Sequence, residues 1–246
     1  MTSLSIKQKV HQYVVLTGMA LFIGLLVGAI DMIFGQGLLL IGDFRSQHWP
    51  LILFLAIAGL VIVYLYKRFG GKASKGMGLI FDVGHAREEK IPLVLVPLIM
   101  LTTWMSHLFG GSVGREGVAV QIGATLSHRF ARHIKIPDAS RIFLMTGMAA
   151  GFAGLFQTPL AATFFALEVL TVGELQLMAL YPALIASIVA SFTSHALGLE
   201  KFAVPLKETL SWTPENLIKV ALLGLAFGLA GKLFAVSLSW LKKTVA

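Results

Sequence analysis

The stretch from Gly110 to Ala124 reads GGSVGREGVAVQIGA and decides how the chain is built. It places Arg115 and Glu116 in a glycine-rich turn, inside a sequence that is otherwise apolar. Isolated charges at bilayer depth are costly, so they mark ion or proton pathways more often than architecture. Glycines ahead of an apolar run allow a discontinuous membrane helix to turn its free amides and positive dipole end toward an anion. The stretch therefore predicts an anion site at a helix N-terminus.

Composition places the chain among polytopic membrane proteins. Of its 246 residues, 57% are hydrophobic and 13% charged, and the mean hydropathy is +0.83. The absence of cysteine excludes disulfides and thiolate metal sites. The net charge of +8 could suggest nucleic acid, but the basic residues stand in short loops between apolar runs. That placement is typical of the positive-inside rule, so no nucleic-acid partner is expected.

The apolar runs predict an all-α protein. Membrane-crossing helices are expected over 13–30, 49–66, 91–109, 175–199 and from Thr213 to about Trp240, with Thr213 as N-cap and Pro214 in the first turn. The short run 76–81 predicts a re-entrant half-helix. The glycine-rich turn should open a helix that ends near 129–135. Pro159 and the glycines at 147, 151 and 154 predict two helices within 142–167.

The basic residues orient these helices. With a cytoplasmic N-terminus, 14 of the 20 basic residues fall on the inside and only Arg45, Lys201 and Lys207 fall outside. The inside residues are Lys7, Lys9, Lys67, Arg68, Lys72, Lys75, Arg87, Lys90, Arg129, Arg132, Lys135, Arg141, Lys242 and Lys243.

A repeat is visible at an offset of 200 residues. Gly24, Leu25, Gly28 and Phe34 recur as Gly224, Leu225, Gly228 and Phe234. The first and last helices have opposite expected orientations, as inverted repeats require. The alternative is chance recurrence of small-xxx-small spacing. We expect one transmembrane domain over 1–246, with a first repeat at 13–199 and the first helix of an inverted second repeat at 213–246.

The motifs resemble the CLC family of chloride channels and proton-coupled anion antiporters. They are Gly114-Arg115-Glu116-Gly117, then Val120-Gln121-Ile122-Gly123, and the segment GFAGLFQTPLA at 151–161. Val118 departs from the pattern, because most members carry proline there. The resemblance implies an inverted-repeat membrane fold with re-entrant half-helices and an incomplete second repeat. It also implies a homodimer formed through the 159–197 helices, in a bacterial inner membrane.

Glu116 is the expected gate and proton-transfer residue. A carboxylate at a helix N-terminus competes with an anion for the same amides, and on protonation it leaves the site open. The alternative is a capping glutamate paired with Arg115. The residues expected to bind the anion are Gly76, Met77, Gly78, Gly114, Arg115, Gly117 and Val118.

Met77 points to the choice of anion. By resemblance, it stands where chloride-handling members carry a serine whose hydroxyl coordinates the ion, and a thioether cannot donate that hydrogen bond. The same serine is replaced in the bacterial fluoride/proton antiporters. The alternative is a methionine that only fills the core.

Glu168 and Val169 occupy the possible internal proton position. Chloride/proton antiporters often carry two consecutive glutamates there, whereas this chain has one followed by valine. The proton-transfer position is therefore apolar, as in the fluoride branch and in some channels. Glu168 itself is expected to be a structural residue at a helix end.

Other polar residues in apolar runs suggest no catalytic chemistry. Lys232 needs a partner or a water-filled cavity. His107, His128 and His195 lack metal-ligand spacing and are expected to be hydrogen-bonded packing residues. No nucleotide loop or nucleophile triad is present, so we expect no enzyme activity, metal or cofactor.

The sequence predicts transport of a small halide anion, with fluoride export coupled to proton import. A chloride channel or chloride/proton antiporter is the alternative, and a non-transporting fragment is the alternative of another class. Because no second glycine-rich half-helix follows Thr213, a missing C-terminal half is expected to complete the pathway.

Overall fold

The computed structural model describes residues 5–171, 173–201 and 211–245. Contacts divide the chain into two units, Met1–Phe202 and Ala203–Ala246, and each is described by itself. All regular structure in the described residues is helical, which confirms the all-α prediction. The first unit holds α1 (Ile6–Gln47), α2 (Leu55–Leu65), α3 (Met77–Gly84), α4 (Leu95–Leu108), α5 (Glu116–Ala131), α6 (Ala139–Phe156), α7 (Pro159–Glu168) and α8 (Leu180–Ala196).

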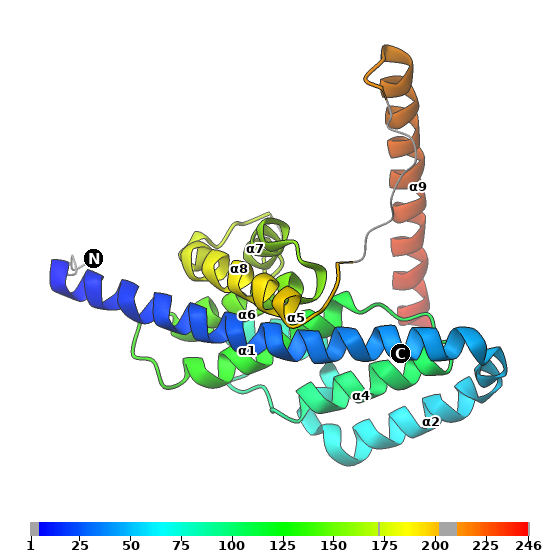
Figure 1. Cartoon of the computed structure of the whole chain (residues 1–246), viewed down its shortest axis with the longest axis horizontal. Helices are drawn as coiled ribbons and strands as arrows, with labels where there is room; N and C mark the ends of the chain where they lie inside the picture. Colours follow the sequence, from blue (N-terminus) through cyan, green and yellow to red (C-terminus); the bar gives the residue numbers. More distant parts are fainter. Residues whose placement is uncertain (1–4, 172, 202–210, 246) are drawn as a thin grey trace. The chain divides into compact units, whose positions relative to one another are not determined.

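Helix α1 is much longer than the predicted span 13–30. Ser5 caps it through a reciprocal pair of hydrogen bonds with Gln8, and it runs for 42 residues. It continues past Asp31, whose buried side chain packs within the protein and does not end the helix. Helix α8 lies alongside α1 (Figure 1). Glycine permits this approach, because a Cβ on Gly24 would lie 2.8 Å from the carbonyl oxygen of Ala186.

The segment between α1 and α4 is less regular than predicted. The expected span 49–66 begins as a 3-10 helix, Trp49–Phe54, and continues as α2. A π turn, Tyr66–Gly70, and a second 3-10 turn, Gly71–Lys75, then lead into α3. Helix α3 has eight residues, which confirms the short half-helix predicted near 76–81.

The predicted full span 91–109 is wrong in length. Helix α4 has only 14 residues, or about 21 Å at roughly 1.5 Å per residue, less than the ~30 Å of hydrocarbon. Residues 92–94 form a tight turn first, in which the Leu95 amide donates to the Pro92 carbonyl and the Val96 amide to the Leu93 carbonyl. The helix therefore begins four residues late.

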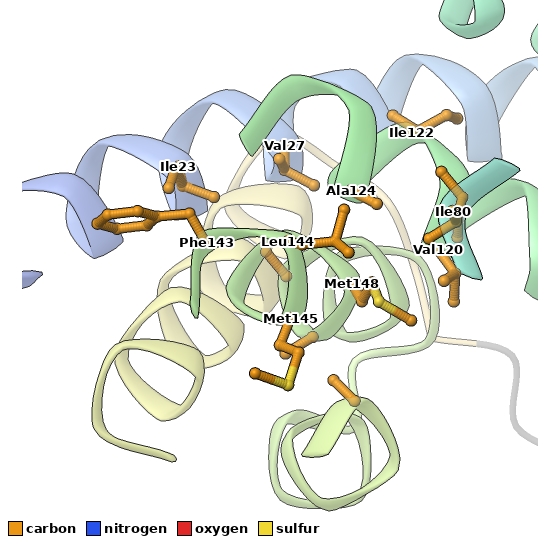
Figure 2. Packing of buried hydrophobic residues seen from close by; sticks show 14 of the residues in the cluster. Ile23, Val27, Ile80, Val120, Ile122, Ala124, Phe143, Leu144, Met145 and Met148 are labelled. Carbon is orange, nitrogen blue, oxygen red and sulfur yellow. The ribbon is translucent and has the colours of Figure 1, made fainter. Parts of the chain in front are cut away.

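The packed centre of the first unit lies between α5 and α6. A Cβ on Gly123 would overlap the carbonyl oxygen of Gly147, and one on Gly151 would overlap that of Ala119. Buried side chains of α1, α3, α5 and α6 fill the space around this contact, as Figure 2 shows for Ile23, Ile80, Val120, Ile122, Phe143 and Met148. The glycines at 147 and 151 thus bring two helices together and do not break α6.

The expected break within 142–167 does occur, three residues after Gly154. Gln157 has a φ of +53°, and Pro159 opens α7 at its first position. Residues 175–199 form a 3-10 turn, Leu177–Ala179, followed by α8.

The second unit contains α9, Pro214–Val245. The Thr213 hydroxyl accepts a hydrogen bond from the Asn216 amide at 3.3 Å, which confirms the predicted N-cap. Lys207, one of the basic residues expected on the outside, is not among the described residues. Across the described part of the chain, five helical segments are long and apolar enough to cross a membrane. The chain is therefore an integral membrane protein.

Candidate functional site

The N-terminus of α5 presents free backbone donors. Gly110 has a φ of +78°, and residues 111–114 have no regular structure before Arg115 takes the N-cap position. The first intrahelical bond runs from the Ala119 amide to the Arg115 carbonyl. No side chain caps this end, so the amides of Glu116, Gly117 and Val118 have no helical partner. The Val118 side chain is buried in the core, so only its backbone is available to a ligand.

A second helix N-terminus lies against the first. Gly76 adopts a φ of +55°, which favours glycine, and turns the chain into α3 at Met77. Met77 lies beside Gly117 on α5, because a Cβ built on Gly117 would be 3.8 Å from Met77 Cγ. Two segments about 40 residues apart, both predicted to bind the anion, are therefore brought together at the starts of two helices.

Glu116 is exposed, and its carboxylate folds back over the preceding turn. A Cβ on Gly114 would lie 2.6 Å from Glu116 Oε2, which shows how closely the carboxylate approaches this turn. Arg115 does not pair with this carboxylate in the described structure. Its guanidinium carbon instead lies 5.4 Å from the ring centroid of Phe156, at the end of α6. The alternative of a capping glutamate held by Arg115 is not what the structure shows.

Gln121 gives the site a polar group to which the sequence assigned no role. Its Nε2 donates to the Gly117 carbonyl at 2.9 Å, which directs Oε1 away from that carbonyl. Oε1 is buried without a hydrogen-bond partner, and a Cβ on Gly76 would lie 3.6 Å from it. The sequence held a signal for this residue, because Gln121 comes one helical turn after Gly117 and so lies on the same face of the helix.

Asp31 is a second polar group that the sequence analysis missed. It is fully buried on α1, and neither carboxylate oxygen has a hydrogen-bond partner in the described structure. A Cβ on Gly154 of α6 would overlap one of these oxygens. An acidic residue at the end of a predicted apolar span was the available signal, since such residues are expensive inside a membrane.

The remaining predicted residues lie elsewhere in the fold. Glu168 is exposed at the last position of α7, in keeping with a helix-end residue, and Val169 packs against the core. His107 contacts the Thr103 carbonyl at 2.9 Å, and His128 lies between the Glu89 carbonyl and the Ser140 hydroxyl. These two are hydrogen-bonded packing residues, as predicted. His195 is in the last turn of α8, and Lys232 is in α9.

Charged residues after α2 form a small ion-pair network. Lys72 Nζ lies 2.6 Å from Glu88, and Lys75 Nζ lies 2.9 Å from Asp82 and 3.4 Å from Glu88. The hydrogen bond from Lys72 holds the pKa of the Glu88 carboxyl below its usual value. The network ties the loop after α3 to the turn that precedes it.

The chain with these two helix starts is similar to a known family and to several known proteins. The family model described as voltage gated chloride channel matches residues 58–246. A chloride/fluoride channel protein of Pseudomonas syringae pv. tomato is 36% identical over 216 residues, which are 87% of this chain and 48% of that relative. The voltage-gated ClC-type chloride channel ClcB of Salmonella typhimurium is 30% identical over 65% of this chain and 35% of its own length.

Solved structures extend these comparisons. The crystal structure of a CLC-type fluoride/proton antiporter matches with a TM-score of 0.84 and 46% identity, covering 93% of this chain and 57% of that one. A slow cyanobacterial chloride/proton antiporter matches with a TM-score of 0.69 and 23% identity, over 88% of this chain and 54% of its own. The second likeness concerns the fold alone. The chain spans about half the length of the curated relatives it matches.

Proposed function

Because the chain belongs to the voltage gated chloride channel family, we propose that it forms the gate-bearing part of an antiporter that exports fluoride and imports protons. One observation carries the proposal: Met77 lies against Gly117, where the starts of α3 and α5 meet.

The chemistry of that contact favours a small, hard anion. The donors at the two helix starts are backbone amides, since α3 and α5 both lack side-chain caps. Met77 contributes a thioether, which donates no hydrogen bond. The site therefore lacks the hydroxyl that, by resemblance, coordinates the ion in chloride-handling members, and this favours fluoride over chloride.

Glu116 is the proposed gate. Its carboxylate is exposed at the α5 N-terminus and is not tied to Arg115, so it is available to compete with an anion for the free amides. Taking up a proton removes its charge and its attraction to the helix end. One side chain would then exchange a proton for an anion, which couples the two fluxes.

Similarity supports fluoride over chloride. The antiporter whose structure matches at 46% identity is described as a fluoride/proton exchanger, and the relative from Pseudomonas syringae is named for both halides.

The setting of the site is also proposed. We place the N-terminus and the basic loops in the cytoplasm, the chain in a bacterial inner membrane, and two copies in a homodimer formed through residues 159–197. Residues outside this chain, from a C-terminal half, complete the anion pathway, because the chain covers 57% of the matching antiporter.

Liposome efflux tests the proposal. The chain is reconstituted alone and together with the C-terminal half of a related fluoride/proton antiporter, and fluoride and chloride efflux are followed with ion-selective electrodes. We expect fluoride efflux to exceed chloride efflux by at least tenfold in the conducting preparation. Glu116→Gln should retain or increase fluoride flux but abolish its coupling to proton movement. Glu174→Gln, at an exposed carboxylate outside the proposed site, is the matched control and should leave flux and coupling unchanged. Equal halide fluxes, or no flux in either preparation, would overturn the proposal.

A further inference from the structure

A surface hollow of about 650 Å³ lies apart from the paired helix starts. Three separate segments line it: the π turn and the 3-10 turn after α2, the loop that leads into α4, and the C-terminal end of α5. The lining residues are Phe69, Gly70, Gly71, Lys72, Lys90, Ile91, Pro92, Leu93, Val94, Arg129 and Arg132.

The charge of the hollow is of one sign. Lys72, Lys90, Arg129 and Arg132 line it, and no acidic residue does. Lys72 is held by Glu88, but the other three have no carboxylate within 4 Å in the described residues. All three are exposed. The hollow therefore carries about three positive charges that the described chain does not neutralise.

The backbone adds to this field. The hollow reaches Val94, the N-cap of α4, and no side chain caps that helix. The positive end of the 14-residue α4 therefore lies on the same opening as the basic side chains.

The edge of the hollow is apolar. Phe69, Leu93 and Val94 line it and are 54%, 43% and 38% exposed, while Gly70 and Ile91 are buried. In a membrane protein, such side chains beside a basic hollow match a ligand that carries a negative headgroup and acyl chains. A free inorganic anion would make no use of them.

We propose that this hollow binds the headgroup of an anionic phospholipid, with the acyl chains lying against Phe69, Leu93 and Val94. The positive-inside rule alone requires only that basic residues be in these loops. It does not require that three separate segments converge on one hollow with an apolar edge. Basic pockets between membrane helices on the cytoplasmic side bind anionic lipid headgroups through this combination.

The test compares lipids on the purified full chain by native mass spectrometry. Dioleoyl phosphatidylglycerol should bind at least tenfold more tightly than dioleoyl phosphatidylcholine. Arg129→Gln with Arg132→Gln should weaken phosphatidylglycerol binding about 25-fold, since each basic side chain near an anionic lipid contributes roughly fivefold. Lys67→Gln with Arg87→Gln removes the same charge at nearby positions that do not line the hollow, and should leave binding unchanged. Arg129→Lys with Arg132→Lys should retain most of it.

Several results would overturn the assignment. Equal binding of the two lipids by the unaltered chain would do so without any variant. An equal loss in both glutamine pairs would show that net charge, and not the hollow, attracts the lipid. Inorganic phosphate that displaces phosphatidylglycerol at millimolar concentration would show a free-anion site instead. None of these results depends on whether the chain transports fluoride.

Discussion

Met77 of α3 lies against Gly117 of α5, close enough that a Cβ on Gly117 would be 3.8 Å from Met77 Cγ. Two helices that begin about 40 residues apart thus meet at their N-termini, where backbone amides lack helical partners. Any side chain at position 77 is therefore placed beside the start of α5, and under the proposed function it should influence which anion the site prefers.

Met77→Ser should shift the halide preference toward chloride. The hydroxyl adds a donor, and a hydrogen bond to a charged group contributes on the order of 1.5–3 kcal/mol, or roughly 10- to 150-fold. The chloride-to-fluoride flux ratio, measured by electrode in liposomes, should rise by about tenfold or more. Met178→Ser, at an exposed methionine in the 3-10 turn before α8, should leave the ratio unaltered. An unchanged ratio in Met77→Ser would show that other residues set the preference.

Gly123→Ala should destabilise the first unit, because the new methyl group would overlap the carbonyl oxygen of Gly147. Overpacking of this kind costs about 1–3 kcal/mol, and thermal unfolding in detergent would report it. Gly18→Ala is the control, since nothing lies within 4 Å of a Cβ at that position of α1. It should be neutral or stabilise by up to about 1 kcal/mol. Equal melting temperatures for the two variants would contradict the close packing of α5 on α6.

Gln121→Leu should reduce fluoride transport without reducing the stability of the protein. Replacing a buried, unpartnered amide oxygen by an apolar group of similar size removes a desolvation cost of about 1–3 kcal/mol, which is offset in part by the lost bond to Gly117. Unfolding should therefore be no easier, while fluoride flux falls, because the amide lies beside Gly76. Gln157→Leu breaks a bond to the Leu199 carbonyl and should lower stability. Full transport in Gln121→Leu would show that the amide has no role in the site.

The Lys72–Glu88 ion pair should make the stability of the loop after α3 sensitive to acid. The pKa of the Glu88 carboxyl lies below the ordinary carboxyl value of about 4.3. The pair therefore contributes stability above about pH 4.3 and loses it as pH falls through the lowered pKa. Hydrogen exchange of residues 85–94 should rise over that range. Glu88→Gln should remove this part of the pH dependence, and an identical acid response in the variant would exclude the pair as its source.

Much of the site could be predicted from local sequence. Gly76 and the glycines of the 110–117 turn mark where helices begin, because a positive φ or an irregular backbone is a local property. Pro159 located the break between α6 and α7 for the same reason. The motifs also gave Glu116 its place at the first position of α5.

The rest depends on contacts between distant segments. Nothing local shows that Met77 reaches Gly117, or that Gly147 and Gly151 pack against α5 rather than interrupt α6. Asp31 was left outside the first span because an acidic residue suggests a helix end, yet tertiary packing carries α1 through it. Helix α4 is shorter than its apolar run, because the chain makes a tight turn before the regular helix begins at Leu95.

The central claim is that one carboxylate, Glu116, exchanges protons for fluoride. The most direct measurement is proton movement, followed with a pH-sensitive dye in liposomes, while a fluoride gradient is imposed on the conducting preparation. With Glu116 present, the fluoride gradient should drive protons against their own gradient. Glu116→Gln should retain or increase fluoride flux and abolish this proton movement. Proton movement that persists at the same ratio to fluoride in Glu116→Gln would contradict the account.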